Sequence, residues 1–189
     1  MLTKLTKKLK SLTQLKHGHG RSTIGANGLG SRQMVDDYLA ALGKYDVSIG
    51  VLVGHSMGGF IAIRALVEQS DAMASHLGGC LMMATFASDV KDEGMMNALI
   101  DAFHKKDLKS LVPILTAFVV EDRYSQLSKV SLPCTIIVGT KDKTTPPFHT
   151  DDLHKGIKNS KLVRVLTKVH MLNWEAPQAL ITKIIALTQ

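Results

Sequence analysis

Short apolar runs alternate with amphipathic stretches along most of this chain. Four runs have the length and continuous apolar character of buried strands, and three stretches have the 3.6-residue spacing of helices. Strands that are apolar on both sides belong to parallel sheets covered on both faces, so the pattern predicts an α/β fold. The expected strands are 47–53, 78–86, 134–138 and 162–166, and the expected helices are 31–42, 57–69 and 177–187.

The strand pattern stops between about residues 89 and 130. Two stretches there, 95–103 and 108–119, have helical spacing with a charged segment between them, which predicts a small helical lid inserted into the main domain. Its apolar side chains have two interpretations that the sequence leaves open: they line a substrate pocket, or they only pack the lid. The candidate substrate-binding residues are Met95, Met96, Phe103, Leu111 and Phe118.

Residues 1–16 form a basic segment ahead of a domain that spans 17–189. Its leucines recur at steps of three and four, on one face of a helix, with the lysines largely elsewhere. Such a helix can contact an anionic membrane surface, act as a transit peptide, or pack on the domain. We expect docking on the domain or burial in a homo-oligomer. The leucines are Leu2, Leu5, Leu9, Leu12 and Leu15.

The net charge of +7 is concentrated at the start of this 189-residue chain. Seven of its 23 Lys and Arg residues precede the first acidic residue, Asp36, and the remainder carries 16 basic and 16 acidic residues. A nucleic-acid-binding protein places its basic residues on the folded domain, so we expect no nucleic-acid partner. No apolar run reaches 18 residues, so we expect no transmembrane helix.

The two cysteines, Cys80 and Cys134, each lie in an apolar run. They are expected to be buried, reduced thiols, which favours a cytoplasmic protein, with a mitochondrial or membrane-associated location as the alternative suggested by the basic segment. Neither has a partner at zinc-ligand spacing, and His17 and His19 lack nearby carboxylates. We therefore expect neither a metal nor a cofactor.

The pentapeptide Gly54-His55-Ser56-Met57-Gly58 has the form G-x-S-x-G and joins a predicted strand to a predicted helix. This context is typical of a nucleophile elbow, in which a sharp turn exposes a serine hydroxyl; the alternative is a glycine-rich turn with an incidental serine. The helix N-terminus would offer the Met57 N–H to a developing oxyanion. We assign His55 a structural role beneath the turn.

Two further candidate residues follow the last two predicted strands. Asp142 lies just past 134–138 and His170 just past 162–166. The carboxyl ends of parallel strands share one edge of the sheet, so Ser56, Asp142 and His170 should converge there. Their chain order is that of a Ser-Asp-His triad. Taken singly, Asp142 could instead stabilise a turn, and His170 could be an ordinary loop histidine.

The sequence resembles the α/β-hydrolase family, specifically its serine esterase and lipase-like members. The resemblance covers about residues 17–189 and rests on GHGRS (18–22), GHSMGG (54–59), GTKDKTTPP (139–147) and VHMLNWEAPQAL (169–180). It implies an α/β-hydrolase fold with a small helical lid. A serine at the elbow argues against the aspartate-nucleophile branch of epoxide hydrolases and haloalkane dehalogenases.

The start of the chain departs from the family pattern. The family places about three strands and an oxyanion-forming loop ahead of the GHGRS segment, and here 17 residues precede Gly18. The resemblance implies that these strands and one oxyanion N–H donor are missing. Three explanations stay open: an N-terminally shortened hydrolase, which we favour, a gap filled by residues 1–16, or an edge covered by another chain.

Two functions remain open from the sequence. The first is a serine hydrolase that cleaves carboxylic esters of apolar acyl or alcohol groups, with Ser56 as nucleophile, His170 as base and acid, Asp142 orienting His170, and Met57 as oxyanion donor. The second is a catalytically impaired or non-catalytic relative that binds an apolar ligand. The first function implies a small-molecule ester as the substrate.

Overall fold

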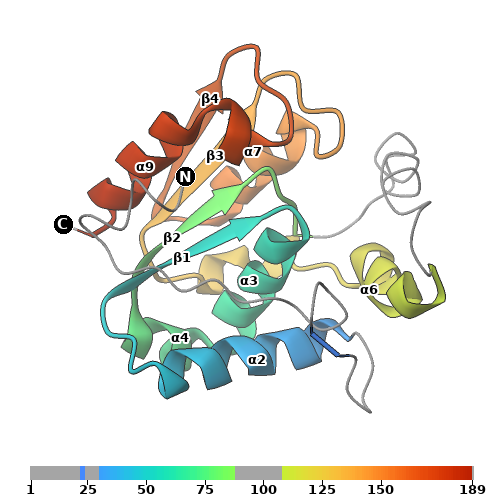
Figure 1. Cartoon of the computed structure of the whole chain (residues 1–189), viewed down its shortest axis with the longest axis vertical. Coiled ribbons are helices and arrows are strands. Elements are labelled where there is room, and N and C mark those ends of the chain that lie inside the picture. Colours follow the sequence, from blue (N-terminus) through green and yellow to red (C-terminus); the bar gives the residue numbers. More distant parts are fainter. Residues whose placement is uncertain (1–21, 24–29, 88–107, 189) are drawn as a thin grey trace.

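Four parallel strands form one sheet, in the order β1-β2-β3-β4, in the computed structural model of this chain (Figure 1). The structure describes residues 22–23, 30–87 and 108–188. The strands of this described part are β1 (Gly50–His55), β2 (Leu77–Met83), β3 (Cys134–Gly139) and β4 (Ser160–Val165). Because neighbours in the sheet are also neighbours in sequence, β1 and β4 lie at opposite edges of the described sheet.

Helices connect the strands and cover both faces of the sheet. Their bounds are α2 (Ser31–Lys44), α3 (Met57–Glu68), α4 (Ser70–His76), α6 (Leu108–Val120), α7 (Pro147–Gly156), α8 (Leu172–Glu175) and α9 (Pro177–Ala186), with the 3₁₀ helix η1 at Tyr124–Lys129. The predicted parallel α/β architecture is therefore confirmed. The predicted helices at 31–42, 57–69, 108–119 and 177–187 correspond to α2, α3, α6 and α9.

The predicted strand bounds were wrong by three residues at two ends and by no more than two residues at the others, and for the first two the backbone gives the reason. β1 begins at Gly50 rather than residue 47, because Ile49 has a positive φ of 54° that interrupts extended structure. β2 ends at Met83 rather than residue 86, because Ala84 has a φ of 46°. The short helices α4 and α8, and the helix α7, were not predicted from the sequence.

Two hydrophobic cores lie on opposite faces of the sheet. The larger contains Met82 and Ile136 of the sheet together with residues of α2, α3, α4 and α7. The smaller contains Leu81 and Ile137 together with residues of α8 and α9. Successive residues of one strand thus point to different cores, as expected for a sheet that is covered on both sides.

The two cysteines lie in the larger core. Cys80 of β2 and Cys134 of β3 are register partners, and both are free and buried, in agreement with the sequence prediction. A hydrogen bond with Cys134, together with burial, raises the pKa of the Cys80 thiol well above its ordinary value.

Helix α6 is anchored to the domain by aromatic and ionic contacts. Phe118 of α6 packs on Phe60 of α3 and on Phe86, with ring centroids 4.9 and 5.1 Å apart. Just past α6, Glu121 accepts hydrogen bonds from Arg64 and Arg123, at 2.7 and 2.8 Å. The same two arginines contact Glu68, which closes a ring of four charged side chains between α3 and the chain that follows α6.

Two predicted segments lie outside the described residues. They are the basic segment, residues 1–16, and the first part of the predicted lid, residues 88–107. The domain division therefore stays a prediction. Within the described ranges, no helix is both long enough and apolar enough to cross a bilayer.

Helix α3 approaches its neighbours closely where it leaves β1. A Cβ added at Gly54 would lie 2.7 Å from the Cα of Gly59, and one added at Gly59 would lie 2.5–2.6 Å from the Thr85 side chain. Gly58 is different, because a Cβ there meets no atom within 4 Å. The close approach is therefore at Gly59, one residue past the G-x-S-x-G motif, and not at the motif's own Gly58.

We expect Gly59→Ala to lower the free energy of unfolding by about 1–3 kcal/mol, because Thr85 is buried and its Cβ has no room to move away. Gly58→Ala is the matched control, on the same helical turn, and should be neutral or slightly stabilising. Urea unfolding of the three proteins measures the difference. Equal destabilisation by both substitutions would contradict the close contact.

Candidate active site

Ser56 occupies a sharp turn between β1 and α3. Its φ of 52° and ψ of −122° are strained for a residue with a side chain, and α3 begins at the next residue. A strand that turns directly into a helix presents the intervening side chain at the edge of the sheet, as in a nucleophile elbow. The backbone at Ser56 therefore has the form that the G-x-S-x-G motif predicts.

Neighbouring segments hold this turn in place. The Ser56 N–H donates to the Met83 carbonyl at 3.0 Å, and the Thr85 hydroxyl donates to the Ser56 carbonyl at 2.7 Å. Both partners belong to the end of β2 or the residues just after it. Met57 is the first residue of α3, so its N–H has no acceptor within the helix and lies at the positive end of the helix dipole.

Asp142 lies in a tight turn after β3 and is buried, with 3% of its surface exposed. One carboxylate oxygen, Oδ1, accepts the N–H groups of Thr144 and Thr145, both at 2.9 Å. The other, Oδ2, accepts the Thr145 hydroxyl at 2.8 Å and His170 Nδ1 at 2.9 Å. Four donors around one carboxylate stabilise its ionised form.

The contact with Asp142 determines which histidine nitrogen is available. A carboxylate only accepts hydrogen bonds, so His170 Nδ1 carries the proton in this pair, and the neutral ring keeps its lone pair at Nε2. The His170 side chain is 17% exposed, whereas that of Asp142 is fully buried. The arrangement can thus accept a proton at Nε2 and stabilise the resulting imidazolium from the Asp142 side.

The loop that carries His170 crosses the carboxyl ends of the strands. His170 follows β4 at one edge of the described sheet, yet its carbonyl accepts the Nε2–H of His55, the last residue of β1 at the other edge, at 3.0 Å. Three strand spacings separate these edges, roughly 14 Å. Gly139 at the end of β3 lies under the crossing, because a Cβ there would lie 2.3–2.4 Å from the Lys168 and Val169 carbonyl oxygens.

Glu175 of α8 holds the loop on both sides of His170. Its two carboxylate oxygens accept the Val169 N–H at 2.9 Å and the Met171 N–H at 3.0 Å. With the His55 contact, three consecutive residues, 169–171, each form a backbone hydrogen bond with a side chain outside this segment. The His55 and His170 rings also lie 4.7 Å apart between centroids.

Burial and hydrogen bonding act in opposite directions on Asp142. Burial alone would raise the pKa of this carboxyl, but the hydrogen bonds from His170 and Thr145 outweigh burial and hold the pKa below its usual range. The pKa of His55 is also lowered, first because burial disfavours the charged ring and second because His170 lies beside it. Asp142 is therefore ionised at neutral pH, and His55 favours its neutral form.

The structure brings the three predicted catalytic residues to one edge of the sheet, with different degrees of contact. Asp142 and His170 are hydrogen-bonded, and Ser56 is the residue after His55, which contacts His170. Among the described residues, no hydrogen bond joins the Ser56 hydroxyl to His170. Hydrogen bonds between a nucleophile and its base are often long in the absence of substrate, so the lack of this contact does not argue against a triad. The triad stays a prediction.

The predicted substrate-binding residues fall into two groups. Met95, Met96 and Phe103 lie outside the described residues, and Leu111 lies in α6 with a side chain outside the described part. Phe118 is 1% exposed and packs on Phe60 and Phe86 in the larger core. For Phe118, this placement favours the packing interpretation that the sequence left open.

Two residues at this site were not singled out from the sequence, Thr145 and Glu175. A local signal existed for each. A threonine two or three residues after an aspartate is typical of a turn in which the aspartate accepts backbone N–H groups. A glutamate in the first turn of a helix often accepts the N–H at the residue before the helix, as Glu175 does with Met171.

Comparison with known proteins gives a consistent fold. A family model described as "Alpha/beta hydrolase family" matches residues 17–183. The protein described as AB hydrolase superfamily protein YisY of Bacillus subtilis (strain 168) is 24% identical over 193 residues, covering 81% of this chain and 71% of the relative.

Two similar solved structures are an esterase from Exiguobacterium antarcticum and a bromoperoxidase from Bacillus anthracis. The esterase has a TM-score of 0.74 and 18% identity, covering 92% of this chain and 79% of its own. The bromoperoxidase has a TM-score of 0.75 and 19% identity, covering 91% of this chain and 79% of its own. At this identity the two structures establish a shared fold.

The lowered pKa of His55 predicts a specific pH dependence of stability. The folded state binds a proton at His55 less readily than the unfolded chain does. Neutral His55 therefore makes its full contribution to the free energy of unfolding above about pH 6.5, and that contribution falls as the pH drops below this value, where the unfolded chain takes up the proton first. His55→Gln keeps an N–H donor but does not titrate. Urea unfolding between pH 7 and pH 5 should show a steeper loss of stability in the wild type than in His55→Gln. Parallel curves would contradict the assignment.

Proposed function

This chain belongs to the alpha/beta hydrolase family, and from that premise we propose that it cleaves carboxylic esters with apolar acyl or alcohol groups through an acyl-enzyme. The family match and the esterase among the similar structures support a hydrolase. The observation that supports ester cleavage through an acyl-enzyme in particular is the strained turn at Ser56. It lies at the same sheet edge as the hydrogen-bonded pair Asp142 and His170.

In the proposed first step, Ser56 Oγ attacks the ester carbonyl carbon and its proton passes to His170 Nε2. The Asp142 carboxylate stabilises the imidazolium that forms, and the Met57 N–H donates to the oxyanion at the start of α3. When the tetrahedral intermediate collapses, the bond to the alcohol oxygen breaks. His170 returns the proton to that oxygen, and the acyl group remains on Ser56.

The second step reverses these roles with water as the nucleophile. His170 Nε2 takes a proton from the water as it attacks the acyl carbon, and the serine oxygen leaves with the proton from the imidazolium. The products are a carboxylic acid and free Ser56. Each step requires the same imidazole position, which in this proposal is maintained by Asp142 at Nδ1, by His55 at the His170 carbonyl, and by Glu175 on either side.

Replacement of the proposed nucleophile gives the decisive test. Against p-nitrophenyl esters of short and medium acyl chains, Ser56→Ala should reduce kcat/KM by about 10⁴-fold or more. A fluorophosphonate probe should label the wild type at Ser56, as located by mass spectrometry. Ser48→Ala, an exposed serine in the loop before β1, is the matched control and should keep full activity.

Absence of turnover and of labelling in folded wild-type protein would overturn the esterase proposal and support the non-catalytic, ligand-binding alternative. Turnover that persists in Ser56→Ala would equally overturn it, because the activity would then arise from another group or from a contaminant.

The Glu175 contacts predict a positioning effect. Glu175→Ala removes both acceptors for the Val169 and Met171 N–H groups, so we expect kcat to fall about tenfold with KM nearly unchanged, since a small displacement of His170 affects the chemical step most. Glu175→Gln keeps one acceptor oxygen and should recover part of that loss. Steady-state kinetics on one ester measures both variants. A Glu175→Ala variant with wild-type kcat would contradict the positioning role.

A further inference from the structure

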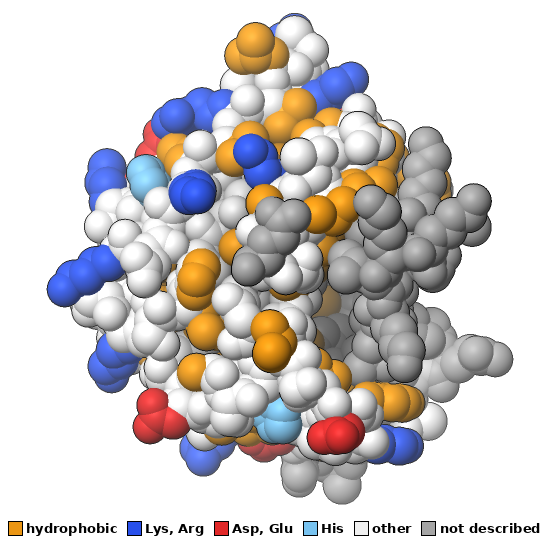
Figure 2. All heavy atoms as spheres, turned by 90° about the vertical axis from the view of Figure 1, so that its left-hand side faces the viewer, with side chains coloured by type: hydrophobic (Ala, Val, Ile, Leu, Met, Phe, Trp, Pro, Cys, Tyr) orange, Lys and Arg blue, Asp and Glu red, His pale blue; other side chains and the backbone are white. Residues whose placement is uncertain are grey.

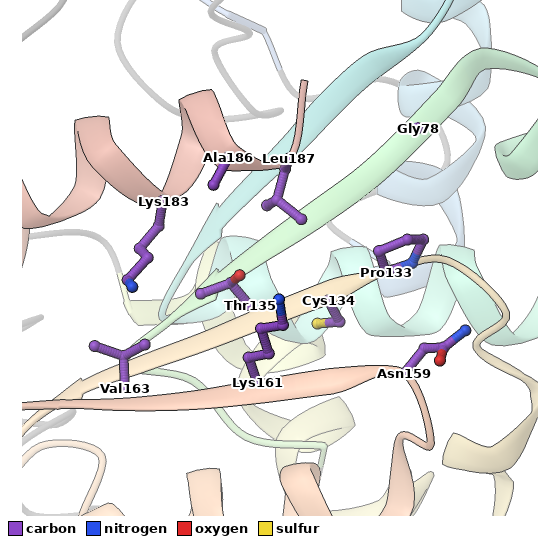
Figure 3. A pocket seen from close by; sticks show the side chains of 10 residues that line it. All are labelled: Gly78, Pro133, Cys134, Thr135, Asn159, Lys161, Val163, Lys183, Ala186 and Leu187. Carbon is purple, nitrogen blue, oxygen red and sulfur yellow. The ribbon is translucent and has the colours of Figure 1, made fainter. Parts of the chain in front are cut away.

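A cavity lies between α9 and the sheet, at the end of the sheet opposite the candidate active site (Figure 3). Its volume is about 300 Å³, which is within the range of small-molecule sites. Gly78, Thr135 and Lys161 line it close to the starts of β2, β3 and β4, whereas Ser56, Asp142 and His170 follow the strand ends. The two sites therefore share no residue.

The floor of this cavity has a polar part and an apolar part. Thr135 and Lys161 are register partners on neighbouring strands, so their side chains lie next to each other on the α9 face of the sheet. Val163 is on the same face, two residues along β4. Figure 3 shows Thr135, Lys161 and Val163 below α9, with Lys183 and Leu187 reaching down from the helix and the residue after it.

Thr135 is the most informative residue of the cavity. It is 4% exposed, and its hydroxyl has no hydrogen-bond partner within the part of the chain that the structure describes. Figure 3 shows its oxygen on the side of β3 that faces α9. The residue lines the cavity, so a ligand can reach its hydroxyl and exchange a hydrogen bond with it.

The charges around the cavity have one sign. Lys161 and Lys183 line it, neither forms an ion pair with a described residue, and its described lining contains no acidic side chain. Figure 2 views the side of the molecule at the left of Figure 1, and Lys and Arg side chains predominate over acidic ones on the upper half of that side. Two ammonium groups beside an unpartnered hydroxyl form a set of donors suited to an anion.

We propose that this cavity binds a small organic anion with an apolar body, whose carboxylate accepts hydrogen bonds from Lys161 and the Thr135 hydroxyl while its apolar part packs between Val163 and Leu187. Lys183, half-buried on α9, supplies the second positive charge. The proposal stands on residues that the proposed catalytic steps do not use, so it holds or fails independently of the esterase activity.

Octanoate is a suitable probe, with 1-octanol and acetate as the matched compounds that lack the charge or the apolar body. Titrations monitored by calorimetry and by the NMR chemical shifts of backbone amides should show saturable octanoate binding. The largest chemical-shift changes are expected at Thr135 and Leu187. Acetate and 1-octanol should each bind at least about tenfold more weakly, because each loses one of the two interactions.

Substitutions locate the site. Thr135→Val keeps the side-chain shape without the hydroxyl, and Lys161→Met keeps the chain length without the charge; each should weaken octanoate binding by about tenfold. Lys161→Arg should retain binding. Lys158→Met, at an exposed lysine outside the cavity, is the control and should bind as the wild type does. Lys183→Met, at the half-buried lysine on α9, provides a further test if Thr135→Val does not fold.

Three results would overturn the proposal. The first is a lack of saturable octanoate binding by the wild type at up to about 10 mM, since affinity weaker than millimolar is negligible for a specific site. The second is unchanged binding in Lys161→Met and Lys183→Met. The third is binding of 1-octanol as tight as that of octanoate, which would show that the cavity recognises only apolar surface.

Discussion

The turn at Ser56 is the constraint on which the rest of the site depends. A residue with a side chain adopts a φ of 52° and a ψ of −122° only when its surroundings compensate for the strain. Here the compensation comes from the Met83 carbonyl and the Thr85 hydroxyl, and from two glycines, Gly54 and Gly59, that let α3 pass close to β1 and to Thr85. The end of β2 and Thr85 just after it therefore support the turn through direct hydrogen bonds.

The candidate site draws its residues from elements that pack into different cores. Ser56 precedes α3, which packs into the larger core, whereas His170 precedes α8, whose Leu172 belongs to the smaller one. The sheet separates these cores, so side-chain packing alone does not hold Ser56 and His170 at a common position. The direct links are polar: His55 to the His170 carbonyl, and His170 to Asp142.

The sequence predicts much of the fold because its strands are continuous apolar runs and its helices have clear spacing. It also predicts which loops meet, since parallel strands end at one edge and Asp142 and His170 follow two of them. It does not predict the bounds of β1 and β2, because positive φ angles at Ile49 and Ala84 interrupt the extended backbone, and neither isoleucine nor alanine is a residue type that indicates such an angle.

The contacts around His170 were missed for a related reason. Glu175 and His55 act through the backbone of the loop, and a side chain that binds backbone leaves no distinctive partner residue in the sequence. Phe118 illustrates the opposite case. Its helical spacing was read correctly, but spacing does not distinguish a side chain that lines a cavity from one that packs beneath it, and the contacts with Phe60 and Phe86 favour the second.

The close passage of the His170 loop over Gly139 has a consequence for how this protein can vary. The loop spans the distance from β4 to His55 with only four residues between Val165 and His170. One extended residue adds about 3.3 Å, so a single insertion or deletion there would move the imidazole by more than the length of a hydrogen bond. The Leu166 side chain is exposed and can be replaced without loss of packing, whereas the number of residues in this loop cannot change.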